Sequence, residues 1–131
     1  MPESTVVLIG SVATGIREFT AGDHTRVQFR MAVNDRRFDR EQECWVDLEP
    51  SFYTVIARRE LAANVSMSLR KGDPIVVTGR LRVRQWSTDD GKRGISTEIT
   101  AISIGHDLAR GTTEFTRVVR VRPQPALAAA A

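Results

Sequence analysis

Alternation of side chains over residues 74–86, "PIVVTGRLRVRQW", constrains the fold more than any other feature of the chain. In a β-strand, residues two positions apart point to the same face of the sheet. One face of this strand would carry Ile75, Val77, Gly79, Leu81 and Val83 toward the core. The other face would carry Val76, Thr78, Arg80, Arg82, Arg84 and Trp86. The segment therefore predicts a half-buried strand with three arginines and an indole on its outer side.

Four more segments have the composition of strands. Residues 5–14 are mostly apolar, with Gly10 expected at a bulge or bend. Residues 51–57 are β-branched and aromatic, and residues 95–105 return after the Asp-Gly turn chemistry of "STDDGKRG". Residues 25–34 alternate, with an apolar face of Val27, Phe29, Met31 and Val33 against a polar face of Arg26, Gln28, Arg30 and Asn34. A polar loop is expected after this last strand.

Only residues 58–72 have the period of a helix, with Leu61, Val65 and Leu69 at i, i+4 and i+8. Arg70 and Lys71 suit its C-terminal end, and the following Gly-Asp-Pro stops it. The order is then β-β-β-α-β-β, which predicts an all-β fold. This fold is a five-stranded OB-fold barrel with one α-helix between strands three and four. An α+β sandwich is the alternative that the pattern leaves open.

Length and composition are those of one domain with a real core, since the chain has 131 residues of which 41% are hydrophobic. We assign residues 1–110 to the OB-fold domain and residues 111–131 to a C-terminal extension. That extension is expected to form a strand at 113–122 and then a short disordered tail. The chain shows no membrane-spanning run or signal peptide. Its single cysteine, Cys44, suits a reducing cytoplasm.

Catalytic and metal-binding patterns are missing from the sequence. Asp89 and Asp90 are adjacent, but the turn in "TDDGK" explains both without a role as metal ligands. His24 and His106 show no ligand spacing with Cys44. Since no nucleophile elbow or phosphate-binding glycine loop occurs either, we expect no enzyme activity, no cofactor and no metal site.

Aromatic rings interleaved with arginine are the remaining functional signal. The net charge is +3, and only Lys71 and Lys92 of the 19 basic residues are lysines. A GC-rich genome favours arginine codons, but arginine also stacks on flat rings and binds phosphate in a fork. Single-stranded nucleic acid offers flat bases and phosphates together. The candidate binding residues are Trp86, Arg84, Arg82, Arg80, Phe52, Arg58, Arg30, Arg37, Phe38, Trp45, Lys71, Lys92 and Arg93.

Several of these residues have a second, purely structural interpretation. Trp86 at a strand end would equally cap the barrel core, and Phe52 in a strand would equally belong to the core. On the binding interpretation Phe52 shares an outer face with Thr54, Ile56 and Arg58, while Tyr53, Val55 and Ala57 point inward. Phe38 and Trp45 would equally pack within their loop. The charges of Arg70 and Lys71 are explained by the helix end alone.

The sequence resembles the bacterial single-stranded DNA-binding protein family from about Val6 to Gly105. The resemblance is carried by "VVLIGSV", "NDRRFDREQECWVDLEPSFYTV", "ELAANVSMSLRKGDPIVVTGRLRVRQW" and "DDGKR…STEI". It implies an OB-fold homotetramer that wraps single-stranded DNA with little sequence preference in replication, recombination or repair. It also implies that Trp86 and Phe52 stack on bases and that Arg84 contacts phosphate. Arg58 stands where many members of the family place another aromatic residue.

The C-terminal region departs most from the replicative members of the family, which carry a flexible tail with an acidic tip. This chain ends "RVVRVRPQPALAAAA", as in the shorter second paralogues of actinobacteria. Recruitment of replication enzymes through an acidic tip is therefore not expected. We expect the protein to be cytoplasmic and associated with the nucleoid. An accessory adaptor of the primosomal type, acting mainly through protein contacts, is the alternative function. An RNA-binding OB domain is a third.

Overall fold

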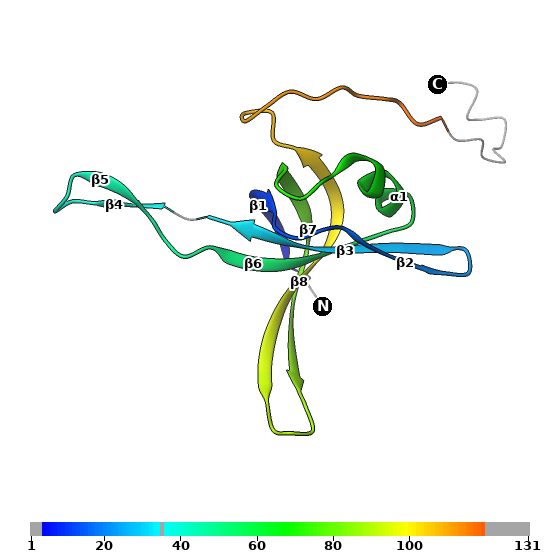
Figure 1. Cartoon of the computed structure of the whole chain (residues 1–131), viewed down its shortest axis with the longest axis horizontal. Helices are drawn as coiled ribbons and strands as arrows, with labels where there is room; N and C mark the ends of the chain where they lie inside the picture. The colour runs from blue at the N-terminus through cyan, green and yellow to red at the C-terminus, as the bar shows by residue number, and fades with distance from the viewer. Residues whose placement is uncertain (1–3, 35, 120–131) are drawn as a thin grey trace.

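The computed structural model describes residues 4–34 and 36–119, which form eight strands and one helix (Figure 1). The elements are β1 (Thr5–Val12), β2 (Arg17–Ala21), β3 (His24–Val33), β4 (Arg36–Asp39), β5 (Cys44–Asp47), β6 (Ser51–Arg58), α1 (Arg59–Ser68), β7 (Pro74–Ser87) and β8 (Arg93–His106). Strands β1, β3, β6, β7 and β8 are the five that the sequence predicts. The helix lies between the third and fourth of them, which confirms the predicted element order.

Closure of the main sheet turns these strands into a barrel. The sheet order is β1-β7-β8-β6-β3-β2, and β1 also pairs with β3 through Ser11↔Ala32 and Val12↔Met31. Gly10 lies where β1 passes from its pairing with β7 to this second pairing. A Cβ atom at Gly10 would lie 2.1 Å from the carbonyl oxygen of Ala32. Only glycine therefore allows the two strands to approach closely enough to close the barrel.

The core fills the inside of this barrel. Its fully buried strand residues are Val12, Val27, Phe29, Met31, Val55, Ala57, Ile75, Val77 and Ile99. Helix α1 adds Ala62 and Val65, and Leu69 just beyond the helix is also buried. The predicted inward faces of the strands and the predicted helix stripe are confirmed at these positions. Helix α1 thus closes one end of the barrel and contacts β3, β6 and β8 (Figure 1).

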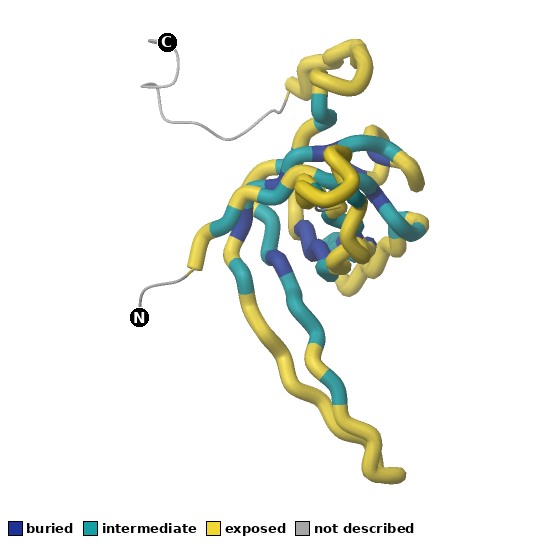
Figure 2. The backbone as a smooth tube through the Cα atoms, turned by 90° about the vertical axis from the view of Figure 1, so that its left-hand side faces the viewer, coloured by how far each residue is buried: buried dark blue, intermediate teal, exposed yellow. Residues whose placement is uncertain are grey.

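Three hairpins project from the barrel, and two of them were not predicted (Figure 1). Strand β2 pairs with β3 through a turn in which Gly22 has a φ of 62°. Residues 36–47, expected as a polar loop, form the hairpin β4–β5. An ion pair of 2.9 Å between Arg36 Nε and Asp47 Oδ1 spans this hairpin. The third hairpin, β7–β8, is the predicted one. Figure 2 shows its exposed end projecting from a centre that contains the buried residues.

The helix is shorter than predicted, because it ends at Ser68 and not at residue 72. Leu69 takes extended backbone angles, which directs its side chain into the core. Gly72 follows with a φ of 97°, and its backbone N–H donates to the carbonyl oxygen of Val12 at 2.8 Å. Arg70 and Lys71 therefore lie in the turn after α1, and the predicted placement of their charges in the last helical turn is wrong.

One predicted inward position is wrong, and one residue with the predicted outward phase is buried. Val83, expected in the core, is 58% exposed, because that part of β7 lies on the projecting hairpin where no second layer covers it. Ile56, expected on the outer face, is buried to 7% exposure. It lies in the middle of the sheet, flanked by Gln28 of β3 and Thr100 of β8, so neighbouring strands enclose it on both sides.

Residues beyond β8 pass over α1 (Figure 1). Residues 113–116 and Val118, together with Leu61, Met67 and Ile104, help to line a shallow groove beside the helix. The strand predicted for 113–122 is absent from residues 113–119, where Phe115 and Val119 are exposed, and residues 120–122 lie outside the described residues. In the described part of the chain no helix has the length and apolar character needed to cross a membrane.

Asp73 ties the turn after α1 to the end of β8. Its carboxylate accepts from the Arg70 backbone N–H at 3.0 Å and lies 3.1 Å from His106 Nε2. Partial burial alone would raise the pKa of Asp73, but these hydrogen bonds and the nearby positive charges outweigh burial and lower it below 3.8. The carboxylate therefore stabilises the fold above its unfolded-state pKa, and this contribution is lost as the pH falls through the folded-state pKa.

We predict that Asp73→Ala lowers the free energy of unfolding by about 1 kcal/mol at neutral pH. The difference in the free energy of unfolding between variant and wild type should shrink as the pH falls below 3.8, because the wild-type carboxylate then loses its charge. Thermal melts followed by circular dichroism between pH 7 and pH 2 measure both effects. Asp23→Ala, in the exposed β2–β3 turn, is the control and should melt close to the wild type. A difference that persists unchanged at pH 2 would contradict the assignment.

Candidate nucleic-acid interface

The outer side of β7 and β8 carries the arginine series that the sequence singled out. Register pairs Arg80 with Thr100, Arg82 with Glu98, Arg84 with Ser96 and Trp86 with Gly94. Directly paired residues share a face of the sheet, so the three arginines and the indole lie on one side. All four side chains are exposed. The alternation over residues 80–86 is confirmed as an outward-facing series.

This face continues across the next two strands. Thr54 of β6 pairs with Glu98 of β8 on one side and with Arg30 of β3 on the other. Phe52 and Arg58, two and four positions from Thr54, have the same phase in β6 and therefore point the same way. The structure thus brings seven predicted residues onto one continuous surface, which we call the outer face. They are Arg30, Phe52, Arg58, Arg80, Arg82, Arg84 and Trp86.

Phe52 belongs to this surface and not to the core. Its side chain is 46% exposed, and the Arg30 guanidinium carbon lies 4.9 Å from the centre of its ring. A guanidinium within about 6 Å of a ring is attracted by the negative π-face. The contact fixes the Arg30 side chain over the ring while its N–H groups remain able to donate. Exposure therefore decides between the two interpretations of Phe52 that the sequence left open.

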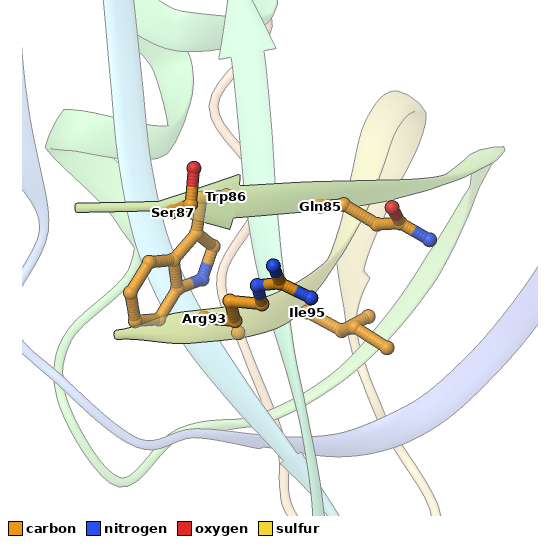
Figure 3. A pocket seen from close by; sticks show the side chains of 6 residues that line it. Gln85, Trp86, Ser87, Arg93 and Ile95 are labelled. Carbon is orange, nitrogen blue, oxygen red and sulfur yellow. The ribbon is translucent and has the colours of Figure 1, made fainter. Parts of the chain in front are cut away.

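Trp86 lies on the projecting part of β7, so it does not cap the core. Its side chain is 47% exposed, and Figure 3 shows the indole reaching across from β7 toward β8. A Cβ atom at Gly94 would lie 2.1 Å from the indole Cζ2, so the ring rests directly on the glycine backbone. Arg93 and Ile95 line the same open hollow as the indole. One face of the ring is thus supported, and the surrounding hollow is open.

One acidic residue lies among the cations of the outer face. Glu98 Oε2 is 3.6 Å from Arg84 Nη1, and the Glu98 side chain is largely buried while that of Arg84 is exposed. A pair with one exposed partner contributes little to stability, but it fixes where the guanidinium lies. Sequence reasoning did not place Glu98 on this face, although its alternation with Ser96 and Thr100 in β8 is visible in the sequence.

Other predicted site residues lie away from the outer face. Phe38 and Trp45 pack edge to face on the β4–β5 hairpin, with ring centres 5.5 Å apart, and both are exposed. Arg37 pairs with Val46, so it points to the opposite side of that hairpin from the two rings. The loop-packing interpretation of Phe38 and Trp45 is confirmed for the contact between them. Their exposure leaves both rings accessible on a separate arm (Figure 1).

The two predicted lysines are far apart. Lys71 lies in the turn after α1, at the end of the barrel opposite the tip of the β7–β8 hairpin (Figure 1). Lys92 lies in that tip, where its carbonyl oxygen accepts from the Thr88 backbone N–H at 2.8 Å. Arg93 opens β8 next to it. Lys92 therefore lies beyond Trp86 on the same hairpin, whereas Arg93 pairs with Ser87 and has the phase opposite to that of Trp86. Lys71 lies away from this surface.

The β7–β8 turn has the local hydrogen bonds and backbone angles that the sequence predicts. The Thr88 hydroxyl donates to the Asp90 carboxylate, and this hydrogen bond lowers the pKa of Asp90. Gly91 has a φ of 89°, as the predicted Asp-Gly turn requires. Within residues 4–34 and 36–119, no group of three or more histidine, cysteine or acidic residues could hold a metal ion.

Sequence reasoning missed a third exposed ring on the same side of the sheet. Phe19 of β2 pairs with Arg26 of β3, and Arg26 pairs with Arg58 of β6. The guanidinium carbons of Arg26 and Arg17 lie 4.9 Å and 5.4 Å from the centre of the Phe19 ring. The signal in the sequence is the Gly-Asp turn in "REFTAGDHTRV", which joins β2 to the strand predicted for residues 25–34.

Comparison with known proteins agrees with this geometry. Residues 3–107 match the single-strand binding protein family. The chain is 44% identical over 134 residues to single-stranded DNA-binding protein 1 of Streptomyces coelicolor, covering 95% of this chain and 84% of the relative. It is 46% identical over 119 residues to single-stranded DNA-binding protein 2 of Streptomyces avermitilis, covering 89% and 73%.

Solved structures give the same result. The crystal structure of the small single-stranded DNA-binding protein from Streptomyces coelicolor matches with a TM-score of 0.77 at 45% identity, covering 85% of this chain and all of that one. The second single-stranded DNA-binding protein from Mycobacterium smegmatis matches with a TM-score of 0.66 at 30% identity, covering 88% and 99%. The predicted OB-fold and the predicted likeness to actinobacterial paralogues are confirmed.

Gly94 should determine how Trp86 is held. We predict that Gly94→Ala forces the indole off β8, because the new methyl group would occupy the space of the ring. In a Trp45→Phe background, Trp86 emission should then shift to the red and its anisotropy should fall. Gly105→Ala, in the same strand but with open space at its Cβ position, is the matched control and should leave both signals unchanged. Identical emission in Gly94→Ala and the control would refute this role of Gly94.

Proposed function

The chain belongs to the single-strand binding protein family, and on this premise we propose that it binds and protects single-stranded DNA without sequence preference. Members of this family are non-enzymatic DNA-binding proteins, which agrees with the absence of catalytic motifs. Binding would combine base stacking on Trp86 and Phe52 with arginine contacts to phosphates. The proposed setting is exposed DNA during replication, recombination or repair in the cytoplasm.

The observation that carries this proposal is the continuity of the outer face. Trp86 and Phe52 present exposed rings, and Arg80, Arg82 and Arg84 follow the same side of β7. Stacking contributes about 1–3 kcal/mol per base and accepts any base, because every base has a π-face. Arginines beside the rings neutralise phosphates without reading sequence. Duplex DNA hides its bases, so this combination favours single strands.

The remaining predicted residues take secondary parts in the proposal. Arg58 replaces the family's aromatic residue with a guanidinium, which can still stack on a base. Phe38, Trp45 and Arg37 would contact a strand that leaves the barrel along the β4–β5 hairpin. Lys92 and Arg93 would contact phosphates beyond Trp86. Lys71, which lies at the far end of the barrel, would contribute only to a strand that wraps the whole assembly.

We further propose that the chain assembles as a homotetramer, as the resemblance to the family implies. Val7 and Ile9 support this, because both are more than half exposed on β1 although they are apolar. Strand β1 pairs with β7 along one edge, while its other edge pairs with β3 only at Ser11 and Val12. The free edge and the exposed apolar side chains are what a β1-to-β1 contact between two copies would use.

The primosomal adaptor remains the second candidate. Exposed apolar residues next to the groove beside α1, among them Met67 and Phe115, favour a role in protein contacts. In that case coating of DNA would be weak or absent. Binding to DNA therefore separates the two functions.

We predict that oligo-dT strongly quenches the intrinsic tryptophan fluorescence, because stacking brings bases onto the indoles. Binding should weaken steeply as salt rises, and duplex of equal length should bind far less. Trp86→Ala should lower the affinity by about 1–3 kcal/mol while the melting temperature stays close to that of the wild type. Arg110→Gln, which lies beyond β8, serves as a control with unchanged affinity. Absence of binding to oligo-dT would support the adaptor instead. Binding without quenching, or equal affinity for duplex, would refute stacking on exposed bases.

For the assembly, we predict that Ile9→Asp dissociates the tetramer into smaller species, because it places a charge in an apolar contact. Light scattering coupled to size-exclusion chromatography measures the mass of the particle. Glu18→Ala, an exposed change on β2 away from β1, should leave the tetramer intact. A wild-type particle with the mass of one chain would contradict the proposed assembly.

A further inference from the structure

The β2–β3 hairpin carries a group of side chains to which the function above gives no role: Arg17, Phe19 and Arg26, which we call the Phe19 cluster. We infer that the Phe19 cluster is an additional contact site for single-stranded nucleic acid, which binds the backbone phosphates and one base of the strand held by Trp86 and Phe52. This inference rests on the proposed function and extends it to a part of the molecule outside the barrel.

The Phe19 cluster combines an exposed aromatic ring with arginines, as the outer face does. Phe19 is 37% exposed. The guanidinium carbons of Arg17 and Arg26 both lie within 5.4 Å of its ring centre. Ring contact orders the long arginine side chains before any ligand arrives, so less entropy is lost on binding. The N–H groups of both arginines remain able to donate to phosphate, and the planar guanidinium groups can stack on a base.

Arg26 of the Phe19 cluster faces another arginine across the sheet. Arg26 stands directly opposite Arg58, and like charges in that arrangement are destabilising. Among the described residues no carboxylate forms an ion pair with Arg17, Arg26 or Arg58. Glu18 has the other phase in β2, and its carboxylate accepts from the hydroxyl of Ser66 in α1 at 3.4 Å. A phosphate group would supply the anion that this corner of the sheet lacks.

Sheet topology places the cluster on the path of a bound strand. The order β7-β8-β6-β3-β2 puts Phe19 four strands away from Trp86, a distance of about 19 Å across the sheet at the usual spacing of strands. Register sets Phe52 and Arg30 toward the Trp86 end of the face and Arg58 toward the Phe19 end. The three exposed rings therefore follow a diagonal across the outer face, with arginines at every step between them.

Oligonucleotide length separates this site from the rest of the face. We choose oligo-dT of about 5 and about 15 nucleotides, near the two ends of the range that one OB-fold covers. Phe19→Ala and the double variant Arg17→Gln/Arg26→Gln are compared with the wild type and with Arg110→Gln. Arg110 is an exposed arginine beyond β8, 3.9 Å from Asp107, and controls for the loss of one charge. Melting temperatures confirm that each variant is folded.

Both variants should bind the long oligonucleotide roughly tenfold more weakly and the short one as the wild type does. The salt dependence should change only in the double variant, by about 0.7 for each lost phosphate contact, because Phe19 carries no charge. Long oligo-dT that contains iodouracil should photocross-link to the tryptic peptide of residues 18–26. If the cluster bound an acidic protein partner instead, both variants would keep the affinity and salt dependence of the wild type, and no cross-link to this peptide would form.

Two failures can be told apart. If the wild type binds both oligonucleotides and both variants match it, the Phe19 cluster is not a contact site, although the proposed function stands. The same conclusion follows if the variants lose no more affinity than Arg110→Gln. If the wild type binds neither oligonucleotide, the proposed function and this inference fail together.

Discussion

Closure of the barrel between β1 and β3 is the constraint on which the rest of the structure depends. It occurs at Ser11 and Val12, immediately after the position where any side chain larger than glycine would collide with the Ala32 carbonyl. Closure gives every strand an inside and an outside, and the inside is wide enough only for the apolar residues that fill it. The polar residues of alternate positions are then forced together on the outside. A continuous basic, aromatic surface is thus a consequence of closing a sheet whose strands alternate in this way.

Strand length creates the second feature of the outer face. Strands β7 and β8 each have 14 residues, more than the barrel can cover, so their ends continue as a two-stranded arm. On this arm there is no core for the inward-facing side chains to enter. Val83 is therefore exposed, while Ile75 and Val77 are buried. The outward phase keeps its function and carries Trp86 beyond the barrel. An arm without a core cannot hold a large ring by burial, so the glycine opposite supports it instead.

The sequence predicted which residues face out, but not where each strand leaves the barrel. Val77 and Val83 occupy equivalent places in the alternating pattern. The pattern indicates which side of the strand a residue faces, but not whether other residues cover that side. Helix α1 was predicted too long for a related reason: Leu69 continues the apolar stripe, although tertiary packing takes it into the core in an extended conformation. Phe19 and Glu98 were missed because their partners lie on other strands. Pairing across a sheet depends on register, which a single chain pattern does not reveal.

Each exposed ring of the outer face is supported in a different way, and this difference has a consequence for binding. Phe52 lies beneath the guanidinium of Arg30, and Phe19 contacts two arginines. A base that stacks on either ring must displace a guanidinium or stack on top of it. Trp86 instead rests on the backbone of Gly94, which cannot compete for the free face of the ring. We therefore expect a strand to engage Trp86 first and then to stack bases on the guanidinium groups that already lie against Phe52 and Phe19.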